Sequence, residues 1–414
     1  MTVQFERAFG GRRVLVTGGA GFVGGAVVRR LVESGARVTV LDDLFTGRAE
    51  TIPTQAAFVK GSVTDQALVR ELVAQSSLVF HMAARNIIAS TANPRDDFET
   101  NIGGTLNILL AAPESRPDRV VYTSSTSVYG NPRSIPINED DLLVPITPYA
   151  VSKLSGEHYC LAFYESYGLP VATVRYSNVY GPGQRPDNPY CGVVSKFLTN
   201  CHQGVALTVH GDGEQTRDFT YIDDAVDATL LAATHPRAEG DVFNVGTGIE
   251  TSVNQLAHLT GRAMGREVDI RHIDRRDIDN IRRRVVNIEK ARRMLRWSPQ
   301  VTMENGLRRT AEWFVAAGFA DGLESDPVVA ARGTVVRPGR EARAELTAAV
   351  ASAAASTATV RAATQIAAAS TAVAATAPAS ADTGAHAAST ATVRSMNLPA
   401  GPSTSTWQPT VAKP

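Results

Sequence analysis

The chain has 414 residues, with 41 Lys and Arg against 41 Asp and Glu, so its formal net charge is zero and no nucleic-acid partner is expected. Three cysteines, Cys160, Cys191 and Cys201, exclude a disulfide scaffold, and neither their spacing nor the histidines indicate a metal site. No apolar run reaches the roughly 20 residues that cross a bilayer, and no signal peptide is recognisable, so we expect a cytoplasmic protein without a membrane partner.

Short apolar strands alternate with helical segments in the first 176 residues. We expect strands at 13–17, 37–41, 78–81, 119–123 and 171–175. Between the first two strands, apolar residues from Val23 to Val32 recur at helical spacing. This alternation predicts an α/β fold with a doubly wound parallel sheet of the Rossmann type, and we assign 1–176 to a dinucleotide-binding domain.

Beyond residue 176 the pattern becomes irregular, with many Gly, Pro and Asn residues before further helices at 222–234 and 288–295. We interpret 177–325 as a smaller, mainly substrate-binding lobe with strands that return to the sheet. From Glu341 to Thr390 the chain has 23 Ala, 13 Ser or Thr and no aromatic residue. Such a stretch has few large side chains to pack, so 326–414 is predicted to be a disordered tail, with nascent alanine helix as the alternative.

A glycine-rich turn lies between the first strand and the first helix. Gly18, Gly21 and Gly24 have GxxGxxG spacing, which lets the backbone approach a pyrophosphate at the helix N-terminus. A purely structural turn is the alternative. Asp42 ends the second strand, where its carboxylate can accept hydrogen bonds from ribose hydroxyls and would repel a 2′-phosphate. The predicted cofactor is therefore NAD rather than NADP.

Tyr149 and Lys153 are four residues apart at the start of a helix, so their side chains share one face. An ammonium near a phenol lowers the phenol pKa from about 10, as does a cationic nicotinamide ring. Tyr149 could then take a proton from a substrate alcohol while a hydride leaves the same carbon. An exposed Tyr and Lys pair is the alternative, but hydroxyls at 123–126 follow an apolar strand and would face the same crevice.

Further motifs occur in order between about residues 12 and 315. They are TGGAGFVG, LDDLFTG, VFHMAA, NIGGTLNIL, YTSSTSVYG, TPYAVSK, RYSNVYGPGQ, GDGEQTRDFTYIDD and FNVGTG. The set resembles the extended short-chain dehydrogenase/reductase family, and within it the NAD-dependent nucleotide-sugar epimerases and dehydratases. The resemblance implies that Ser125, Tyr149 and Lys153 are the catalytic trio. Tyr149 would be the base, and Ser125 would hydrogen-bond the reacting oxygen of the substrate. It also implies a homodimer built on helices near 94–112 and 149–167.

The resemblance further implies a set of cofactor contacts, in which Lys153 also holds the nicotinamide ribose. The contacts are Gly18, Gly21, Phe22, Val23, Gly24, Asp42, Asp43, Leu44, Ala83, Ala84, Asn101, Thr123, Tyr149 and Lys153. Ser62 and Val63 stand where relatives have an Asp-Ile pair against the adenine, and here the carboxylate is missing.

The residues before Val128-Tyr129-Gly130 bear on the reaction. Related 4,6-dehydratases carry an Asp-Glu pair there and decarboxylases a Glu, whereas this chain has Thr126 and Ser127, whose hydroxyls cannot replace those carboxylates. The resemblance then implies an epimerase, which oxidises C4 of a UDP-hexose and returns the hydride to the opposite face. A UDP-glucuronate 4-epimerase, a keto-sugar reductase that uses NADPH and a noncatalytic dinucleotide sensor are the alternatives.

Several residues are expected to bind the sugar nucleotide. Asn178 and Arg217 match the family's phosphate-binding positions, and a guanidinium suits phosphate oxygens. A second phosphate-binding arginine is either Arg276 or Arg282, and Ser125 and Thr126 would contact the sugar. Arg284 would disfavour N-acetyl sugars by its size. Arg284 or Arg185 could instead meet the carboxylate of a uronate, although a neutral UDP-hexose is favoured.

Overall fold

We describe a computed structural model of the chain, which covers residues 2–188, 190–275 and 279–319. All of these residues belong to one compact unit. The predicted tail at 326–414 and the candidate Arg276 lie outside the described residues.

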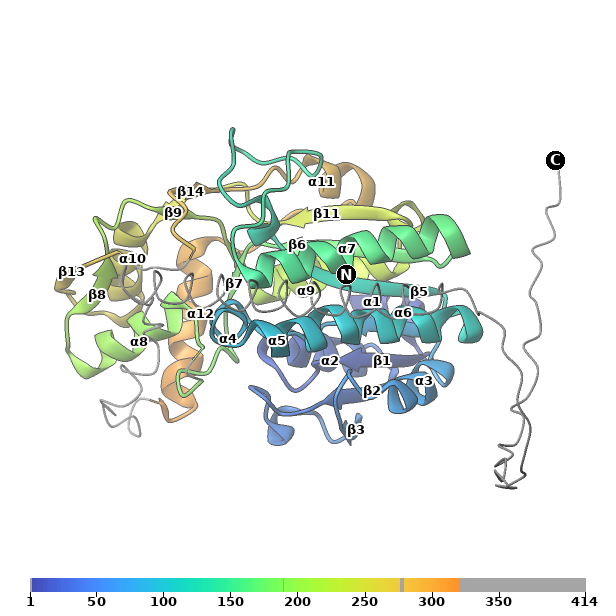
Figure 1. Cartoon of the computed structure of the whole chain (residues 1–414). Coiled ribbons are helices and arrows are strands. Elements are labelled where there is room, and N and C mark those ends of the chain that lie inside the picture. Colours follow the sequence, from blue (N-terminus) through green and yellow to red (C-terminus); the bar gives the residue numbers. More distant parts are fainter. Residues whose placement is uncertain (1, 189, 276–278, 320–414) are drawn as a thin grey trace, which may run out of the picture. The chain divides into compact units, whose positions relative to one another are not determined.

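The described residues form a seven-stranded parallel sheet with the strand order β11-β6-β5-β4-β1-β2-β3 (Figure 1). Its strands are β1 (Arg13–Thr17), β2 (Arg37–Asp42), β3 (Ala57–Lys60), β4 (Leu78–His81), β5 (Arg119–Ser125), β6 (Val171–Tyr176) and β11 (Asp241–Val245). The predicted doubly wound sheet is therefore confirmed. β11 comes from the second half of the chain and pairs with β6, so a piece of that half returns to the sheet as predicted.

Helices cover both faces of the sheet. They are α2 (Phe22–Glu33), α3 (Gln66–Ala74), α4 (Ile87–Ala92), α5 (Pro94–Asp97), α6 (Gly104–Ser115), α7 (Pro148–Tyr167) and α9 (Ile222–Thr234). Alternate residues of a strand point to opposite faces, so Val14 and Val16 of β1 join the core under α2 and α9, whereas Leu15 joins the core under α3, α6 and α7. Both faces are therefore apolar, as parallel strands require.

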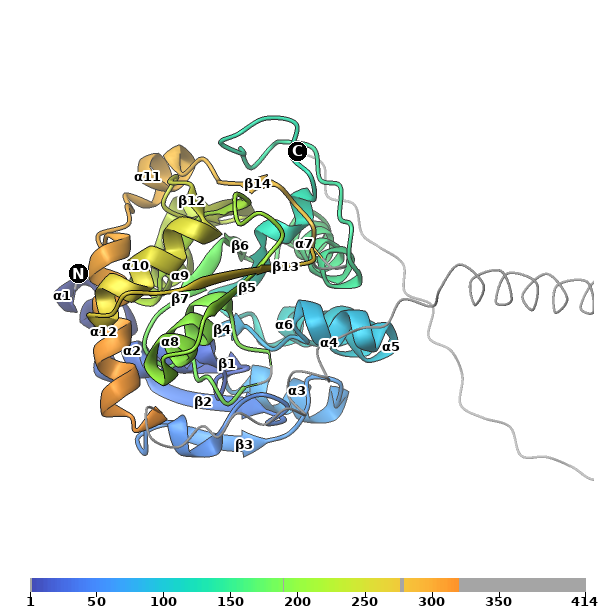
Figure 2. The ribbon, with the colours of Figure 1, turned by 90° about the vertical axis from the view of Figure 1, so that its left-hand side faces the viewer.

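Most of the remaining elements gather at the end of the sheet where the strands finish, on the left of Figure 1 and facing the viewer in Figure 2. The helices there are α8 (Val193–Gln203), α10 (Val253–Met264) and α12 (Met303–Ala316), whereas α11 (Glu289–Leu295) packs beside β11 and α1 (Thr2–Phe9) precedes β1. The short strands are β7 (Asn178–Tyr180), β8 (Leu207–His210), β9 (Thr216–Arg217), β10 (Phe219–Tyr221), β12 (Thr251–Ser252), β13 (Ile270–Ile273) and β14 (Arg283–Arg284).

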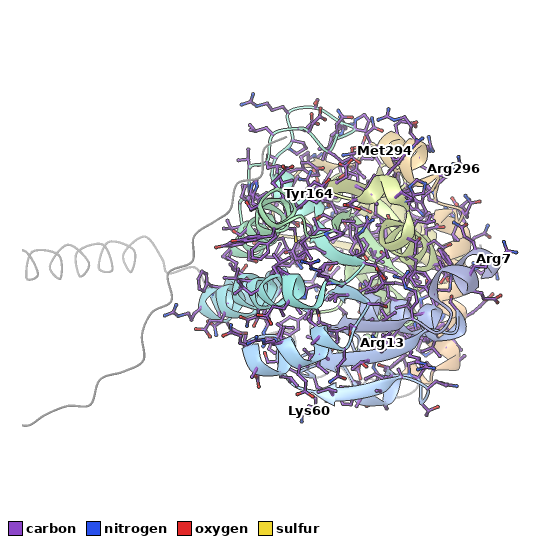
Figure 3. All side chains as sticks on the ribbon, turned by 90° about the vertical axis from the view of Figure 1, so that its right-hand side faces the viewer. Arg7, Arg13, Lys60, Tyr164, Met294 and Arg296 are labelled. Atoms are coloured by element: carbon purple, nitrogen blue, oxygen red, sulfur yellow. The ribbon has the colours of Figure 1, made fainter. Side chains whose placement is uncertain are left out.

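The opposite end of the sheet, where the strands begin, faces the viewer in Figure 3. Exposed cationic side chains, among them Arg7, Arg13 and Arg296, are spread over this face. Among the described residues, no helix combines the length and the apolar character needed to cross a bilayer.

One predicted helix contains a π-helical turn. The pattern predicts a single helix near 94–112, but the structure has α5, then a π-helix at Phe98–Gly103, then α6. A π-turn places an extra residue in the helical backbone and is frequent at functional sites. Here it contains Asn101, which hydrogen-bonds the chain after β4.

Candidate active site

The glycine-rich turn joins β1 to α2 at the carboxyl end of the sheet. The N-cap residue of α2 is Gly21, which has no side chain to bond the first N–H groups of the helix. These N–H groups therefore remain available to an anion. A Cβ on Gly18, whose φ is +72°, would lie 2.7 Å from the Ala83 nitrogen, and a Cβ on Gly24 would lie 2.1 Å from the Gly18 carbonyl oxygen. The backbone therefore requires glycine at two of the three predicted positions.

Asp42 lies beside this turn at the end of β2. One carboxylate oxygen accepts a hydrogen bond from the Ala20 N–H at 2.9 Å, and the other accepts one from the Leu44 N–H at 2.8 Å. Burial raises the pKa of Asp42, against the effect of these backbone hydrogen bonds. Each oxygen keeps a further lone pair, so the carboxylate can still accept hydroxyl hydrogens from a ribose.

A cavity of about 280 Å³ runs from the glycine turn to Tyr149 and Lys153. Its lining includes most of the predicted cofactor contacts, namely Gly18, Gly21, Phe22, Val23, Gly24, Asp42, Asp43, Val63, Ala83, Ala84, Thr123, Tyr149 and Lys153. Leu44, Ser62 and Asn101 are not part of the lining. Ser124 also lines the cavity, and its buried hydroxyl has no partner among the described residues. The uncapped helix, the glycines and this unpaired hydroxyl fit a dinucleotide.

The predicted catalytic trio comes together at the other end of the cavity. Thr147 caps α7 by accepting a hydrogen bond from the Ala150 N–H at 3.1 Å, which places Tyr149 in the first turn of the helix. Ser125 ends β5, its hydroxyl donates to Ser127 Oγ at 3.1 Å, and its proximity to the Tyr149 hydroxyl acts to lower the pKa of that group. Lys153 lies one turn further, and its ammonium donates to the Thr123 carbonyl oxygen at 2.8 Å.

In the protein chain by itself, Lys153 is not among the groups that shift the pKa of Tyr149. Burial raises the pKa of Tyr149 to about 12, the bond with Ser125 opposes this rise, and Asp97 adds to it. Burial also lowers the pKa of Lys153 to about 8. The phenol is therefore held in its neutral form, and only a further positive charge at the site would favour the phenolate.

His81 ends β4 and is buried beneath the cavity. Thr17 Oγ1 accepts the N–H groups of Met82 and Ala83, so its own hydrogen points to His81 Nδ1 at 2.8 Å. On the other side, His81 Nε2 contacts Thr105 Oγ1 at 2.9 Å. Burial and the nearby Lys153 ammonium lower the pKa of His81 to about 3. His81 is thus a neutral structural residue.

We expect this neutral histidine to make folding sensitive to acid. Below pH 6.5, the ordinary pKa of histidine, His81 is protonated in the unfolded chain but stays neutral in the folded chain. The free energy of unfolding therefore falls as the pH decreases toward 3. Between pH 6.5 and pH 5 the loss from His81 is about 1.6 kcal/mol. Urea unfolding at both pH values should show a smaller loss for His81→Gln. The exposed His158→Gln should keep the full loss, and equal losses in all three proteins would contradict a neutral His81.

The predicted phosphate-binding residues Asn178 and Arg217 lie on short strands that follow residue 176. Asn178 begins β7, and Arg217 lies opposite Arg284 where β9 pairs with β14. Both arginines approach one carboxylate: Arg284 Nη2 lies 2.6 Å and Arg217 Nη2 3.8 Å from Asp279 oxygens. Arg217 also donates to the Ile281 carbonyl at 2.8 Å. Arg217 and Arg284 are thus brought together, with Asp279 between them.

The other candidate cations are separate from this pair. Arg282 is exposed and binds Asp212 at 2.7 Å. Arg185 binds Asp187 at 2.8 Å, and its guanidinium lies 4.9 Å from the centre of the Phe319 ring. Each of these arginines therefore has a carboxylate partner within the chain.

The sheet, the glycine turn and the Tyr149–Lys153 pair are matched by a family model over residues 14–246, described as the NAD dependent epimerase/dehydratase family. The chain belongs to this family. Its cofactor is accordingly NAD, and a nucleotide sugar is the class of substrate that solved relatives bind.

Individual members of the epimerase/dehydratase family agree with this assignment. A UDP-glucose 4-epimerase of Mycolicibacterium smegmatis is 37% identical over 310 residues, which is 73% of this chain and 98% of the relative. A UDP-N-acetyl-alpha-D-glucosaminuronate decarboxylase of Bacillus cytotoxicus is 35% identical, with 73% and 98% covered. A crystal structure of the Thermotoga maritima UDP-glucose 4-epimerase with UDP-glucose has a TM-score of 0.71 and 36% identity, and covers 74% of this chain and 99% of that one. Relatives of similar identity thus catalyse different reactions.

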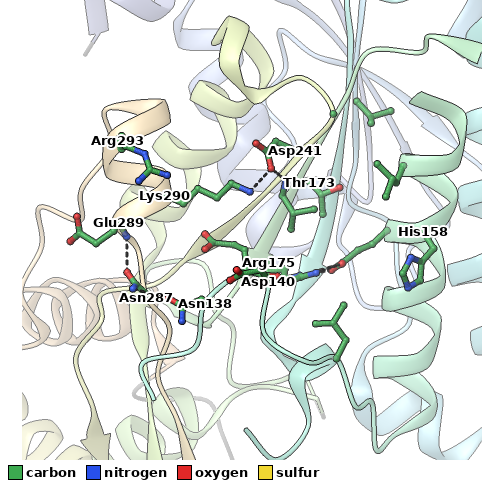
Figure 4. A pocket seen from close by; sticks show the side chains of 17 residues that line it. Asn138, Asp140, His158, Thr173, Arg175, Asp241, Asn287, Glu289, Lys290 and Arg293 are labelled. Carbon is green, nitrogen blue, oxygen red and sulfur yellow. Dashed lines mark hydrogen bonds and ion pairs between the residues drawn. The ribbon is translucent and has the colours of Figure 1, made fainter. Parts of the chain in front are cut away.

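A second and larger cavity, of about 620 Å³, lies along the β11 edge of the sheet between α7 and α11 (Figure 4). Among its charged side chains, Arg175 pairs with Glu157 and Lys290 pairs with Asp241. None of the predicted site residues lines it. In this member of the family the chemistry is therefore expected in the smaller cavity.

Sequence reasoning missed several residues that support the predicted site. Arg85 lines the cofactor cavity, pairs with Asp43 at 2.9 Å and with Asp96 at 2.7 Å, and stacks on Phe45. Asp97, in contact with Asn101, was also missed. Both residues could have been found from their positions in the sequence. Arg85 directly follows the predicted Ala83 and Ala84, and Asp97 precedes Asn101 by one helical turn.

Proposed function

We propose that the chain is an NAD-dependent UDP-hexose 4-epimerase. The observation that supports this choice is the distribution of carboxylates around the cofactor cavity. Among the described residues that line it, Asp42 and Asp43 are the carboxylates, and both lie at the end near the glycine turn. At the catalytic end the buried Thr126 and Ser127 follow Ser125. A dehydratase or a decarboxylase needs an additional acid or base there, whereas an epimerase needs only Tyr149.

The proposed cycle assigns one task to each residue. Bound NAD supplies the hydride acceptor and then the donor. Tyr149, as the phenolate, takes the proton of the sugar C4 hydroxyl while Ser125 hydrogen-bonds the same oxygen, and Lys153 keeps positive charge next to the phenolate. After the keto-sugar has rotated so that the opposite face of C4 meets the cofactor, the hydride returns to C4. Tyr149 then returns the proton to the C4 oxygen. No proton or hydride is gained or lost overall, so NAD stays bound between turnovers.

The pairing of the cations supports a neutral hexose over a uronate. Arg284 is only 5% exposed, and its guanidinium binds Asp279, while Arg185 binds Asp187. A uronate carboxylate would have to compete with these internal carboxylates for either arginine. A neutral sugar makes no such demand.

The proposal is tested by incubating the purified chain, without added cofactor, separately with UDP-glucose and UDP-glucuronate, and by analysing the products by chromatography and NMR. We expect conversion of UDP-glucose to UDP-galactose and release of bound NAD when the protein is denatured. Turnover of the uronate alone, loss of carbon dioxide or water, or consumption of NADPH would each contradict the proposal and identify the competing activity.

We also propose that the enzyme forms a homodimer and is cytoplasmic, as the sequence predicts. Exposed apolar side chains on the two helical segments support the dimer: Phe98, Leu110, Val151, Tyr159 and Leu161. Light scattering after size exclusion measures the assembly directly.

A further inference from the structure

Asp97 is a buried carboxylate at the end of α5, with 4% of its surface exposed. Its Oδ1 atom accepts three hydrogen bonds, from Ser90 Oγ at 2.5 Å, Asn101 Nδ2 at 2.6 Å and Ser152 Oγ at 2.9 Å. Within the described ranges, it forms no ion pair with a Lys, Arg or His side chain. A buried charge without a cationic partner is costly, so its presence calls for a role.

The hydrogen bonds of Asp97 reach both walls of the cofactor site. Ser152 precedes Lys153 on α7, and Asn101 holds the chain after β4. Asn101 Oδ1 accepts from the Arg85 N–H at 2.7 Å, and its Nδ2 donates to the Arg85 carbonyl at 3.1 Å. Because an amide accepts only through its oxygen, Asp97 fixes which end of Asn101 faces the Arg85 N–H. Asp97 thereby joins the catalytic helix to a segment that lines the cavity.

The charge of Asp97 also acts on the catalytic pair. It raises the pKa of Lys153, against the larger effect of burial, and it raises the pKa of Tyr149. The other titratable groups that act on Lys153 are Glu157 and Cys160 on its own helix, and the neutral His81 lies nearby on β4. The Tyr122 ring of β5 lies 5.0 Å from the Lys153 ammonium, and Ser125 is the polar partner of Tyr149. Asp97 is therefore the carboxylate that acts on both members of the pair.

We propose that Asp97 is a positioning residue whose buried charge sets the pH range in which Tyr149 and Lys153 work, while its hydrogen bonds hold Asn101 and Ser152. This inference rests on the proposed acid-base roles of that pair. Removing a negative charge makes proton loss easier for both groups, so the range moves to lower pH. Asn101, placed by resemblance among the cofactor contacts, then acts on the cofactor through the backbone of Arg85.

The Asp97→Asn variant separates charge from geometry, because Oδ1 alone makes the three hydrogen bonds and an asparagine retains that oxygen. The readout is the tyrosinate ultraviolet absorbance of the NAD-loaded protein as a function of pH. Subtracting the same curve for Tyr149→Phe isolates Tyr149 from the other tyrosines. We expect the Tyr149 step to move to lower pH by about one unit in Asp97→Asn, and in the same direction in Asp97→Ser.

Ser90→Ala is the matched control, since it removes one hydrogen bond to Asp97 and leaves the charge in place. In this variant the Tyr149 absorbance step should stay at the wild-type pH. The inference would be overturned if the Tyr149 absorbance step did not move in Asp97→Asn and Asp97→Ser, or if both of these variants failed to fold. The absorbance measurement needs no sugar, so a chain without epimerase activity would refute the proposed function and still test Asp97. With an active enzyme, both limbs of the kcat/KM profile should move to lower pH.

Discussion

Replacing Tyr149 by phenylalanine should lower kcat by about 10²- to 10⁴-fold, the usual contribution of a positioned acid-base group. The variant loses only the hydroxyl that would exchange a proton with the sugar, while the ring still packs at the start of α7. The NAD content and the melting temperature should therefore stay near the wild-type values. Turnover of UDP-glucose, released NAD and thermal unfolding are the three measurements.

Tyr167→Phe is the control for this variant, because Tyr167 lies at the far end of the same helix and is exposed. It should retain wild-type turnover. Full activity in Tyr149→Phe would refute the proposed mechanism, and loss of bound NAD would show that the hydroxyl serves the cofactor instead.

Adding one methyl group at Gly24 should abolish stable NAD binding. The Cβ of Gly24→Ala would lie 2.1 Å from the Gly18 carbonyl oxygen and 3.0 Å from the Gly19 Cα, so the turn must move away from α2. Overpacking of this kind costs about 1–3 kcal/mol of folding free energy. NAD released from the purified protein and the urea midpoint measure the two effects.

The adjacent residue provides a matched control. A Cβ on Gly25 would find its nearest neighbour at 3.5 Å, which is ordinary contact, and Ala is the better helix former. Gly25→Ala should therefore keep its NAD and its stability. Equal behaviour of the two variants would contradict the close contact between α2 and the glycine turn.

Much of the fold could be predicted because its signals are local. The predicted strands at 13–17 and 78–81 and the helix at 222–234 agree with β1, β4 and α9, and the other three predicted strands end one or two residues later in the structure. The π-turn within the helix near 94–112 could not be predicted. It contains Asn101, which binds the Arg85 backbone, and periodicity within one segment carries no information about that contact.

The candidate site shows the same contrast. The glycine turn, Asp42 and the Tyr149–Lys153 spacing were recognisable because each depends on neighbours in the chain. The protonation state of Tyr149 was not, since it depends on burial and on Asp97, which comes from another helix. The pairing of Arg185 with Asp187 and of Arg284 with Asp279 likewise became visible only when side-chain positions were known.

The sequence by itself determined the order of strands and helices, the glycine turn and the class of cofactor, because hydrophobic period, glycine spacing and the end of a strand are properties of short segments. Only the tertiary structure decided which charges face one another. Asp97 and Ser152 are 55 residues apart and Arg85 and Asn101 are 16 apart, yet they form one hydrogen-bonded network. Packing brings such groups together and removes water from them, and both effects together set how the protons at Tyr149 and Lys153 are held.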